Sequence, residues 1–175
     1  MGIFEFIFKK EGPPVEAREN SSIRKIIEEL EHFPPQDAKY IAAFAYLLGR
    51  VAHADLNISS EETQRMEDIL RDFAHLAADQ AILIVQIAKS QNLLFGATEN
   101  YLVAREFKKI SNPEQREDLL HCLFAVAGAD DDITFPEEEE IRQIAKELGF
   151  QHKDFIHVRL HYRDKLSVLK KLPRP

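Results

Sequence analysis

The sequence is poor in several residues and patterns that define large protein classes. It has one cysteine, Cys122, which excludes an intrachain disulfide framework and is compatible with a reducing compartment. Its six glycines form no phosphate-binding loop, and no serine lies in a nucleophile elbow. No apolar run approaches the ~18 residues of a membrane-spanning helix. The sequence therefore gives no support to a kinase, a hydrolase or an integral membrane protein.

The charge balance is acidic and points away from nucleic acid. The net charge is −7, and no basic patch outweighs the acidic residues. Apolar residues make up 45% and charged residues 30% of the 175, which is ordinary for a globular domain that can bury a sizeable core. An excess of carboxylates instead suits a bound cation or a basic partner.

The first twenty residues differ from the rest of the chain. The apolar stretch "GIFEFIFKK" is followed by "EGPPVEARENSS", which is typical of a linker. The stretch lacks the basic region and the cleavage site of a secretory signal. It could lie on a membrane surface, dock on the core or bind a partner. We expect residues 1–20 to be a segment with a linker, and residues 21–175 to form a single domain.

Helical periodicity dominates this domain, and alternating strand patterns are absent. The sequence predicts an all-α fold of eight helices. The first four are "IRKIIEELEHF", residues 36–53, a helix that begins after Ser59, and residues 78–94. The last four are residues 99–110, a helix that begins after Asn112, a helix between Thr134 and Gly149, and "KDFIHVRLHYRDKLSVLKKL". The second and sixth are apolar nearly all round, which predicts burial at the centre.

The chain contains an internal repeat, which appears when the sequence is shifted so that Leu48 lies on Leu123. At this shift "LLGRVAHADLNISSEETQRMEDIL", which begins at Leu47, matches the later segment at eight of 24 positions without a gap. The flanking helices correspond at the same shift. We interpret the chain as two four-helix repeats, about residues 21–95 and 96–171, related by a pseudo-twofold axis.

The repeat centres on an acidic loop with the pattern D-x-[ND]-x-[ST]-x-x-E. Alternating oxygen side chains and a helical carboxylate can surround a hard cation. The loop is not an EF-hand, because it lacks glycine at the sixth position and glutamate at the twelfth. The predicted ligands are Asp55, Asn57 and Glu62 in the first copy, and Asp130, Asp132 and Glu137 in the second.

Helix capping offers another explanation for the two glutamates. Ser59 with Glu62, and Thr134 with Glu137, have the spacing of capping boxes, which need no metal. The aspartates are harder to explain in this way. Asp55 and Asp130 follow helix C-termini, where the helix dipole disfavours negative charge. A divalent cation, with calcium favoured, would relieve this repulsion, and the second loop offers more carboxylates.

The repeated A-x-A-D-x-x-I-x-x-x-E resembles the signature of the tellurite-resistance TerB-like family, which includes the N-terminal part of the DjlA co-chaperones. This resemblance spans about residues 36–149. It implies an all-α duplicated fold, cation binding through acidic residues, and roles in bacterial envelope stress and metal resistance, without catalysis. The family pattern usually reads A-D-G, whereas this chain lacks the glycine in both copies. Asn and Asp tolerate left-handed backbone better than most residues.

Four histidines are further candidate site residues. His157 and His161 have the i, i+4 spacing that can share a metal, although a solvated or half-buried face is the simpler interpretation. His53 and His121 belong to the predicted central helices, where we expect packed, hydrogen-bonded side chains.

Two functional hypotheses follow from these patterns. The first is a non-enzymatic TerB-like module that binds a divalent cation and acts in metal or envelope stress through a protein or membrane partner. The second is a structural interaction module whose acidic loops are helix caps and a docking surface, without metal. In either case we expect a cytoplasmic protein that binds no nucleic acid. A membrane-surface contact through residues 1–10 and a homodimer stay open.

Overall fold

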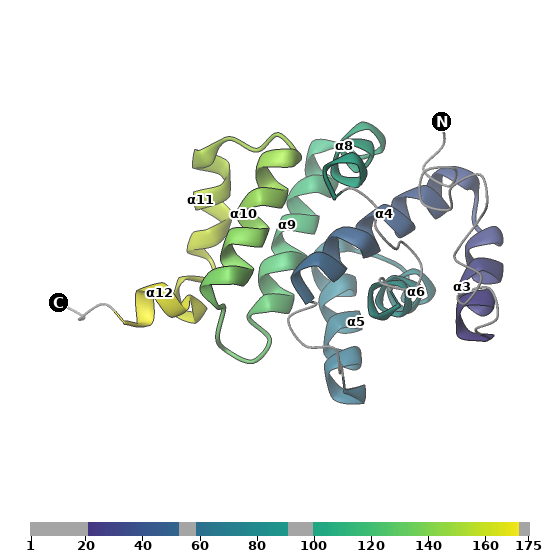
Figure 1. The fold of residues 1–175 in the computed structure, drawn as a ribbon, viewed down its shortest axis with the longest axis horizontal. Coiled ribbons are helices and arrows are strands. Elements are labelled where there is room, and N and C mark those ends of the chain that lie inside the picture. The colour runs from purple at the N-terminus through teal and green to yellow at the C-terminus, as the bar shows by residue number, and fades with distance from the viewer. Residues whose placement is uncertain (1–20, 53–58, 91–99, 172–175) are drawn as a thin grey trace.

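The protein is entirely helical wherever its structure is described. A computed structural model describes residues 21–52, 59–90 and 100–171, and within these ranges it contains nine α-helices, one 3₁₀ helix and no strand. The helices are α3 (Ser21–Glu31), α4 (Pro35–Ala52), α5 (Ser60–Ala74), α6 (Ala78–Lys89), α8 (Asn100–Ile110), α9 (Pro113–Ala127), α10 (Phe135–Glu147), α11 (His152–Leu160), η1 (Arg163–Lys165) and α12 (Ser167–Lys170). The predicted all-α class is confirmed (Figure 1).

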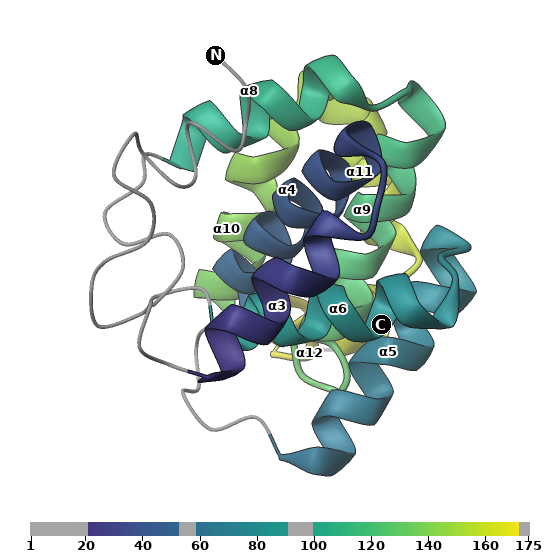
Figure 2. The ribbon, with the colours of Figure 1, turned by 90° about the vertical axis from the view of Figure 1, so that its right-hand side faces the viewer.

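Helices α4 and α9 form the centre of the molecule, as their apolar sequences predicted. Every residue from 41 to 48 of α4 is buried. Helix α4 packs against α6, α8 and α9, while α9 also contacts α5, α10 and α11. Figure 1 shows α9, α10 and α11 side by side, with α4 crossing toward α3, and Figure 2 shows α3 and α6 beside α4. One continuous apolar core extends from Ile26 to Leu166.

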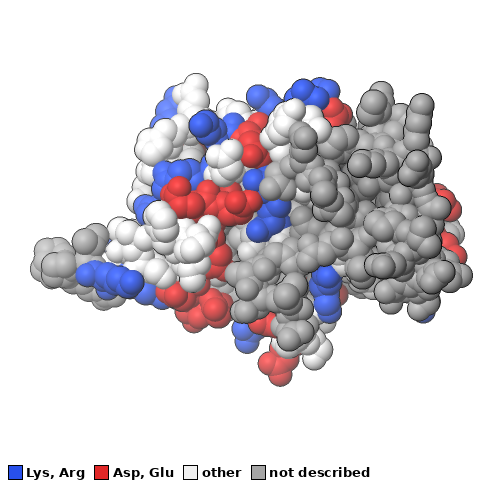
Figure 3. Space-filling model, viewed as in Figure 1, with Lys and Arg blue, Asp and Glu red and all other residues white. Residues whose placement is uncertain are grey.

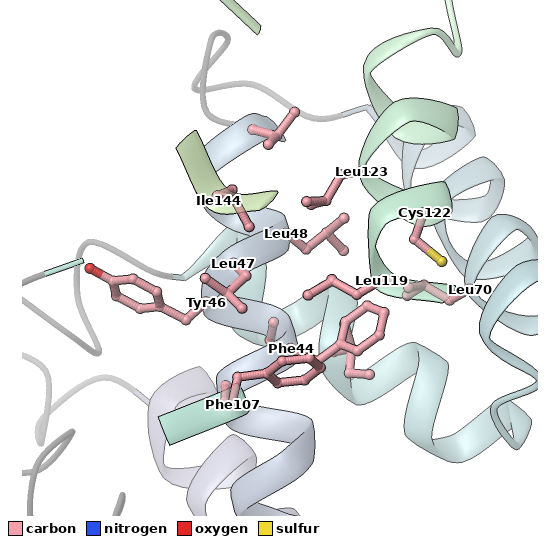
Figure 4. Close-up of a cluster of buried hydrophobic side chains, with 14 of the residues drawn as sticks. Phe44, Tyr46, Leu47, Leu48, Leu70, Phe107, Leu119, Cys122, Leu123 and Ile144 are labelled. Atoms are coloured by element: carbon pink, nitrogen blue, oxygen red, sulfur yellow. The ribbon is translucent and has the colours of Figure 1, made fainter. Parts of the chain in front are cut away.

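An aromatic cluster attaches α8 to this centre. The ring of Phe107 lies 6.1 Å from that of Phe44 and 5.3 Å from that of Tyr40, measured between centroids. Phe44 and Phe107 are fully buried (Figure 4). Cys122 is also buried on α9, and burial raises the pKa of its thiol, so the residue is packed as a small apolar side chain.

A buried ion pair joins α4 to α10. The guanidinium of Arg50 donates from Nε to Glu140 Oε1 at 2.6 Å and from Nη1 to Glu147 Oε2 at 2.7 Å. The Arg50 side chain is only 4% exposed. A guanidinium this buried needs both carboxylates, because an uncompensated buried charge is costly. The contact therefore fixes α10 against the end of the central helix.

The eighth predicted helix is interrupted, which corrects its predicted extent. Helix α11 ends at Leu160, and Leu166 is extended, with φ −73° and ψ 115°. Ile133 N–H donates to the Lys165 carbonyl at 2.7 Å, and Ser167 N–H donates to the Ile133 carbonyl at 3.0 Å. This bridge buries Leu166 and Ile133 completely. Burial of the two side chains and the bridge hydrogen bonds replace the helical bonds lost there.

The other predicted helices have close counterparts. Gly149, with φ 86°, lies just beyond the end of α10 and matches the expected C-terminal glycine. The fourth helix was predicted to reach Leu94, but α6 ends at Lys89, and Leu94 lies outside the described residues. Among the described helices, none combines the length and apolarity needed to cross a membrane. The apolar stretch in residues 1–10 also lies outside the described part of the chain.

Candidate functional site

The candidate site is the connection between α9 and α10, residues 128–134, together with the carboxylates that follow it. Helix α9 is capped by Gly128, where an added Cβ would lie 2.8 Å from Lys165 Cδ and 3.2 Å from the Phe124 carbonyl oxygen. Glycine at this position lets the Lys165 side chain cross the end of α9. The connection therefore receives a lysine from the C-terminal part of the chain.

Asp131 occupies the position at which the family pattern has glycine. Its backbone is left-handed, with φ 65°. Aspartate is one of the few side chains that adopt this conformation at modest cost. Asp131 therefore adopts the left-handed turn conformation at the position of the missing glycine in the second copy.

Asp132 accepts the most side-chain hydrogen bonds of the three aspartates. Its Oδ1 accepts a hydrogen bond from Ser167 Oγ at 2.8 Å and another from Lys170 Nζ at 3.1 Å. These hydrogen bonds lower the pKa of Asp132. Asp130 Oδ1 accepts from the backbone N–H of Asp132 at 3.2 Å. Asp132 is therefore held as a carboxylate by the C-terminal segment.

Two lysines supply the positive charge that this loop requires. Lys165 Nζ lies 3.0 Å from the Gly128 carbonyl oxygen and 3.3 Å from Asp131 Oδ1. Lys170 Nζ donates to the Asp131 carbonyl oxygen as well as to Asp132. We call Lys165 to Lys170, which carries both ammonium groups, the basic strap. It pairs with the side chains of Asp131 and Asp132.

Glu137 closes a capping box at the start of α10. Its Oε2 accepts from Thr134 N–H at 2.8 Å and from Thr134 Oγ1 at 2.7 Å, and its own N–H donates to Thr134 Oγ1 at 3.4 Å. Ser59 and Glu62 make the same box at α5, with distances of 2.6 and 3.1 Å. Hydrogen bonds from Ser59 lower the pKa of Glu62. Both predicted capping boxes are confirmed.

The caps provide a prediction about stability. Replacing Ser59 or Thr134 with alanine removes the acceptor of the N3 amide and should lower the free energy of unfolding by about 1 kcal/mol each. Denaturant unfolding measures this change. Ser60→Ala is the matched control, because Ser60 is the exposed first residue of α5 and is not its cap. A loss of equal size in the control would contradict the capping interpretation.

The predicted ligands are not gathered around one point in the described arrangement. Within residues 21–52, 59–90 and 100–171, no group of three or more His, Cys, Asp or Glu side chains is placed to hold an ion. Asp132 and Glu137 direct oxygens into the strap and the cap, so a metal there would require these contacts to rearrange. Asp55 and Asn57 lie outside the described residues. Metal ligation by the six residues stays a prediction.

Glu138 is a buried charge that the sequence did not reveal. The sequence assigned residues 137–140 mainly to the start of a helix, yet Glu138 is 2% exposed. Its Oε1 accepts from Arg159 Nε at 2.6 Å and from Arg142 Nη2 at 3.2 Å, and its Oε2 has no hydrogen-bond partner among the described residues. The i, i+4 spacing from Arg142 is a local signal, whereas Arg159 comes from α11. The ion pair between Glu138 and Arg159 joins α10 to α11.

The described histidines are arranged largely as expected. His121 is half-buried on α9 and contacts the hydroxyl of Tyr162 at 3.2 Å through Nδ1. His157 and His161 are exposed. His53 lies outside the described residues.

The family comparison agrees with the all-α fold. A family model described as "Tellurite resistance protein TerB" matches residues 40–160, which is more than half of the chain. The match runs from within α4 to the end of α11 and includes both acidic connections. No curated protein and no solved structure shows a significant match. The chain belongs to the TerB family of tellurite-resistance proteins.

Proposed function

We propose that this chain is a non-enzymatic TerB-family module that acts through a protein partner, and that a basic segment of the partner binds at the α9–α10 connection. The observation that carries the proposal is the placement of Lys165 and Lys170. Their ammonium groups already contact the oxygens of Gly128, Asp131 and Asp132. A surface that accepts lysines of its own chain has the chemistry to accept lysines of another.

The charge around this connection supports a basic ligand. The Asp131 side chain is largely exposed beside Lys165, and Glu139 pairs with Arg142 at the surface. Figure 3 shows acidic atoms gathered over α10 and over the connection beside it. Electrostatic complementarity of this kind raises association rates and selects partners more than it raises affinity.

An exposed aromatic residue adds an apolar contact to the same surface. Phe135, the first residue of α10, is 60% exposed, and Val168 of the basic strap is also exposed. Phe135 and Val168 each lie two residues after the bridge between Ile133 and Leu166, which holds their two segments side by side. An aromatic anchor surrounded by charged residues is a common arrangement in protein interfaces. The partner we propose therefore presents lysine or arginine next to an apolar side chain.

A divalent cation, with calcium favoured, is the second candidate ligand. The connection offers carboxylate and carbonyl oxygen atoms, which hard cations prefer. In this form of the proposal, the ion replaces the ammonium groups of Lys165 and Lys170. Asp130, Asp132 and Glu137 remain its proposed ligands in the second copy, with Asp55, Asn57 and Glu62 in the first.

A variant without the strap lysines tests both candidates. We expect Lys165→Ala/Lys170→Ala to bind a fluorescent lysine-rich peptide about tenfold more tightly than the parent, because the internal competitor is gone. Fluorescence anisotropy at low ionic strength measures this, with a neutral peptide as the ligand control. Adding Asp131→Asn should weaken binding, whereas Glu29→Gln, on the exposed face of α3, should not. Equal effects of these two substitutions would show nonspecific charge attraction and refute the proposed surface.

Calcium is tested in parallel on chelator-stripped protein. If calcium raises the midpoint of thermal unfolding in the parent and in the lysine variant, but not after Asp130→Asn, the ligand is an ion. A ligand that binds only the folded state stabilises it by ~2.7 kcal/mol at a hundredfold excess over its dissociation constant. If calcium changes no midpoint while the peptide binds, the basic segment is the ligand.

The duplicated organisation forms part of the same proposal. When Leu48 is placed on Leu123, α4 corresponds to α9 and α5 to α10, and the acidic connections between them correspond as well. Helix α5 packs on α9 while α10 packs on α4, the reciprocal contacts that a pseudo-twofold axis through α4 and α9 would produce. We propose that residues 21–175 form one domain built in this way. A role in bacterial metal or envelope stress is proposed from the family alone.

A further inference from the structure

Three imidazoles lie in a row near the end of α11. The ring of His161 lies 5.5 Å from that of His121 and 5.4 Å from that of His157, measured between centroids. His121 comes from α9, while His157 and His161 lie one turn apart on α11 and its C-cap. The fold thus brings together side chains from two helices that are distant in the sequence. The proposed function uses none of them.

The hydrogen bond of His161 determines which of its ring nitrogens is free. Its Nδ1 lies 3.1 Å from the carbonyl oxygen of His157. A carbonyl oxygen can only accept, so Nδ1 carries the hydrogen. In the neutral ring, Nε2 then keeps its lone pair. This is the arrangement in which metal-binding histidines are usually held.

Tyr162 imposes the same tautomer on His121. The Tyr162 hydroxyl donates its hydrogen to the carbonyl oxygen of His121 at 3.1 Å. The hydroxyl oxygen is therefore left to accept from His121 Nδ1, which lies 3.2 Å away. His121 Nε2 is again the nitrogen with a free lone pair. Two neighbouring rings are thus oriented by fixed backbone and phenol partners.

The surroundings of His121 favour its neutral form. The ring of Phe73 stacks on His121 with centroids 6.0 Å apart and an angle of 9°. Burial, together with His161 and His157, lowers the pKa of His121, while Glu117 acts in the opposite direction. A neutral ring is the form that binds a metal. His157 is exposed and packs edge-on against the ring of His161.

We propose that His121 and His161 bind one imidazole-preferring transition-metal ion, of the class of Zn²⁺, Ni²⁺ and Cu²⁺, and that His157 becomes its third ligand. Two imidazoles bound to one tetrahedral ion through Nε2, at about 2.0 Å, have ring centres roughly 5 Å apart. The centroid distance between His121 and His161 is close to this value. No three ligating side chains in the described part of the chain already surround one point, so His157 must change rotamer to complete the set. Water fills the remaining positions.

Titration of untagged, chelator-stripped protein tests this site. We expect Zn²⁺ and Ni²⁺ to bind in isothermal titration calorimetry, and Co²⁺ to develop the visible absorption of nitrogen ligation, whereas Ca²⁺ does neither. His161→Gln should weaken binding at least tenfold, and His157→Gln should weaken it less. His152→Gln is the matched control, because His152 is the exposed first residue of the same helix. Circular dichroism confirms that each variant is folded.

Tyr162→Phe separates this site from ordinary surface histidines. Phenylalanine keeps the ring that stacks on Phe124 at 5.2 Å but removes the acceptor for His121 Nδ1. Loss of such a partner weakens metal affinity by about tenfold to a hundredfold. The proposal is overturned if the parent binds none of the ions, if His152→Gln weakens binding as much as His161→Gln, or if Tyr162→Phe has no effect. Asp130→Asn, which tests the acidic connection, should leave Zn²⁺ binding unchanged.

Discussion

Replacing Arg50 with methionine is expected to lower the free energy of unfolding by about 3 kcal/mol, the lower end of the range for removing one member of a buried ion pair. Methionine keeps much of the length of the side chain but leaves Glu140 and Glu147 without their shared partner. Both carboxylates retain some exposure, which lets water reach them and limits the loss. Denaturant unfolding followed by circular dichroism measures the change.

Arg71→Met is the control for this substitution. Arg71 lies on the exposed face of α5 and should change stability by less than about 0.5 kcal/mol. Arg50→Lys separates charge from geometry, because lysine keeps the charge but cannot donate to two carboxylates in a planar fork. The free energy of unfolding of Arg50→Lys should lie between those of the parent and Arg50→Met. Equal stabilities for Arg50→Met and Arg71→Met would show that the ion pair contributes nothing to the attachment of α10.

Replacing Phe107 with alanine should cost about 4 kcal/mol, because it leaves a cavity where an aromatic ring was completely buried. The lost ring contacts Phe44 and Tyr40 and attaches α8 to the central helix. The loss should appear in both the unfolding midpoint and the near-ultraviolet circular dichroism, since tyrosine packing changes at the same place.

Tyr101→Ala is the matched substitution for Phe107→Ala. It removes an aromatic ring from the same helix, but Tyr101 is 53% exposed. We expect its cost to be below about 1 kcal/mol, since a mostly exposed side chain leaves no sealed cavity. A comparable loss in both variants would mean that helix propensity, rather than burial, accounts for the effect.

The features that the sequence predicted are local ones. Capping boxes at Ser59 and Thr134 depend on residues three apart, and the burial of α4 and α9 follows from sequences that are apolar nearly all round. Each of these is determined by neighbouring residues along the chain, so the sequence contains it directly.

The features that the sequence did not predict depend on distant segments. Arg50 meets two carboxylates from the second half of the chain, and Lys165 crosses an earlier helix end at Gly128. The eighth predicted helix was interrupted because Leu166 is buried against Ile133, which helical periodicity cannot indicate. Acidic residues that have no partner near them in the sequence therefore pair in the fold with basic residues from distant segments.

The bridge between Ile133 and Leu166 has a consequence for where this protein can be cut. The family match ends at residue 160, and a shortened chain designed from that match would seem complete. Such a chain would lose Leu166, uncover Ile133 and remove both ammonium groups from the aspartates of the acidic connection. The segment that matches the family model thus ends before the residues that complete the packing around Ile133.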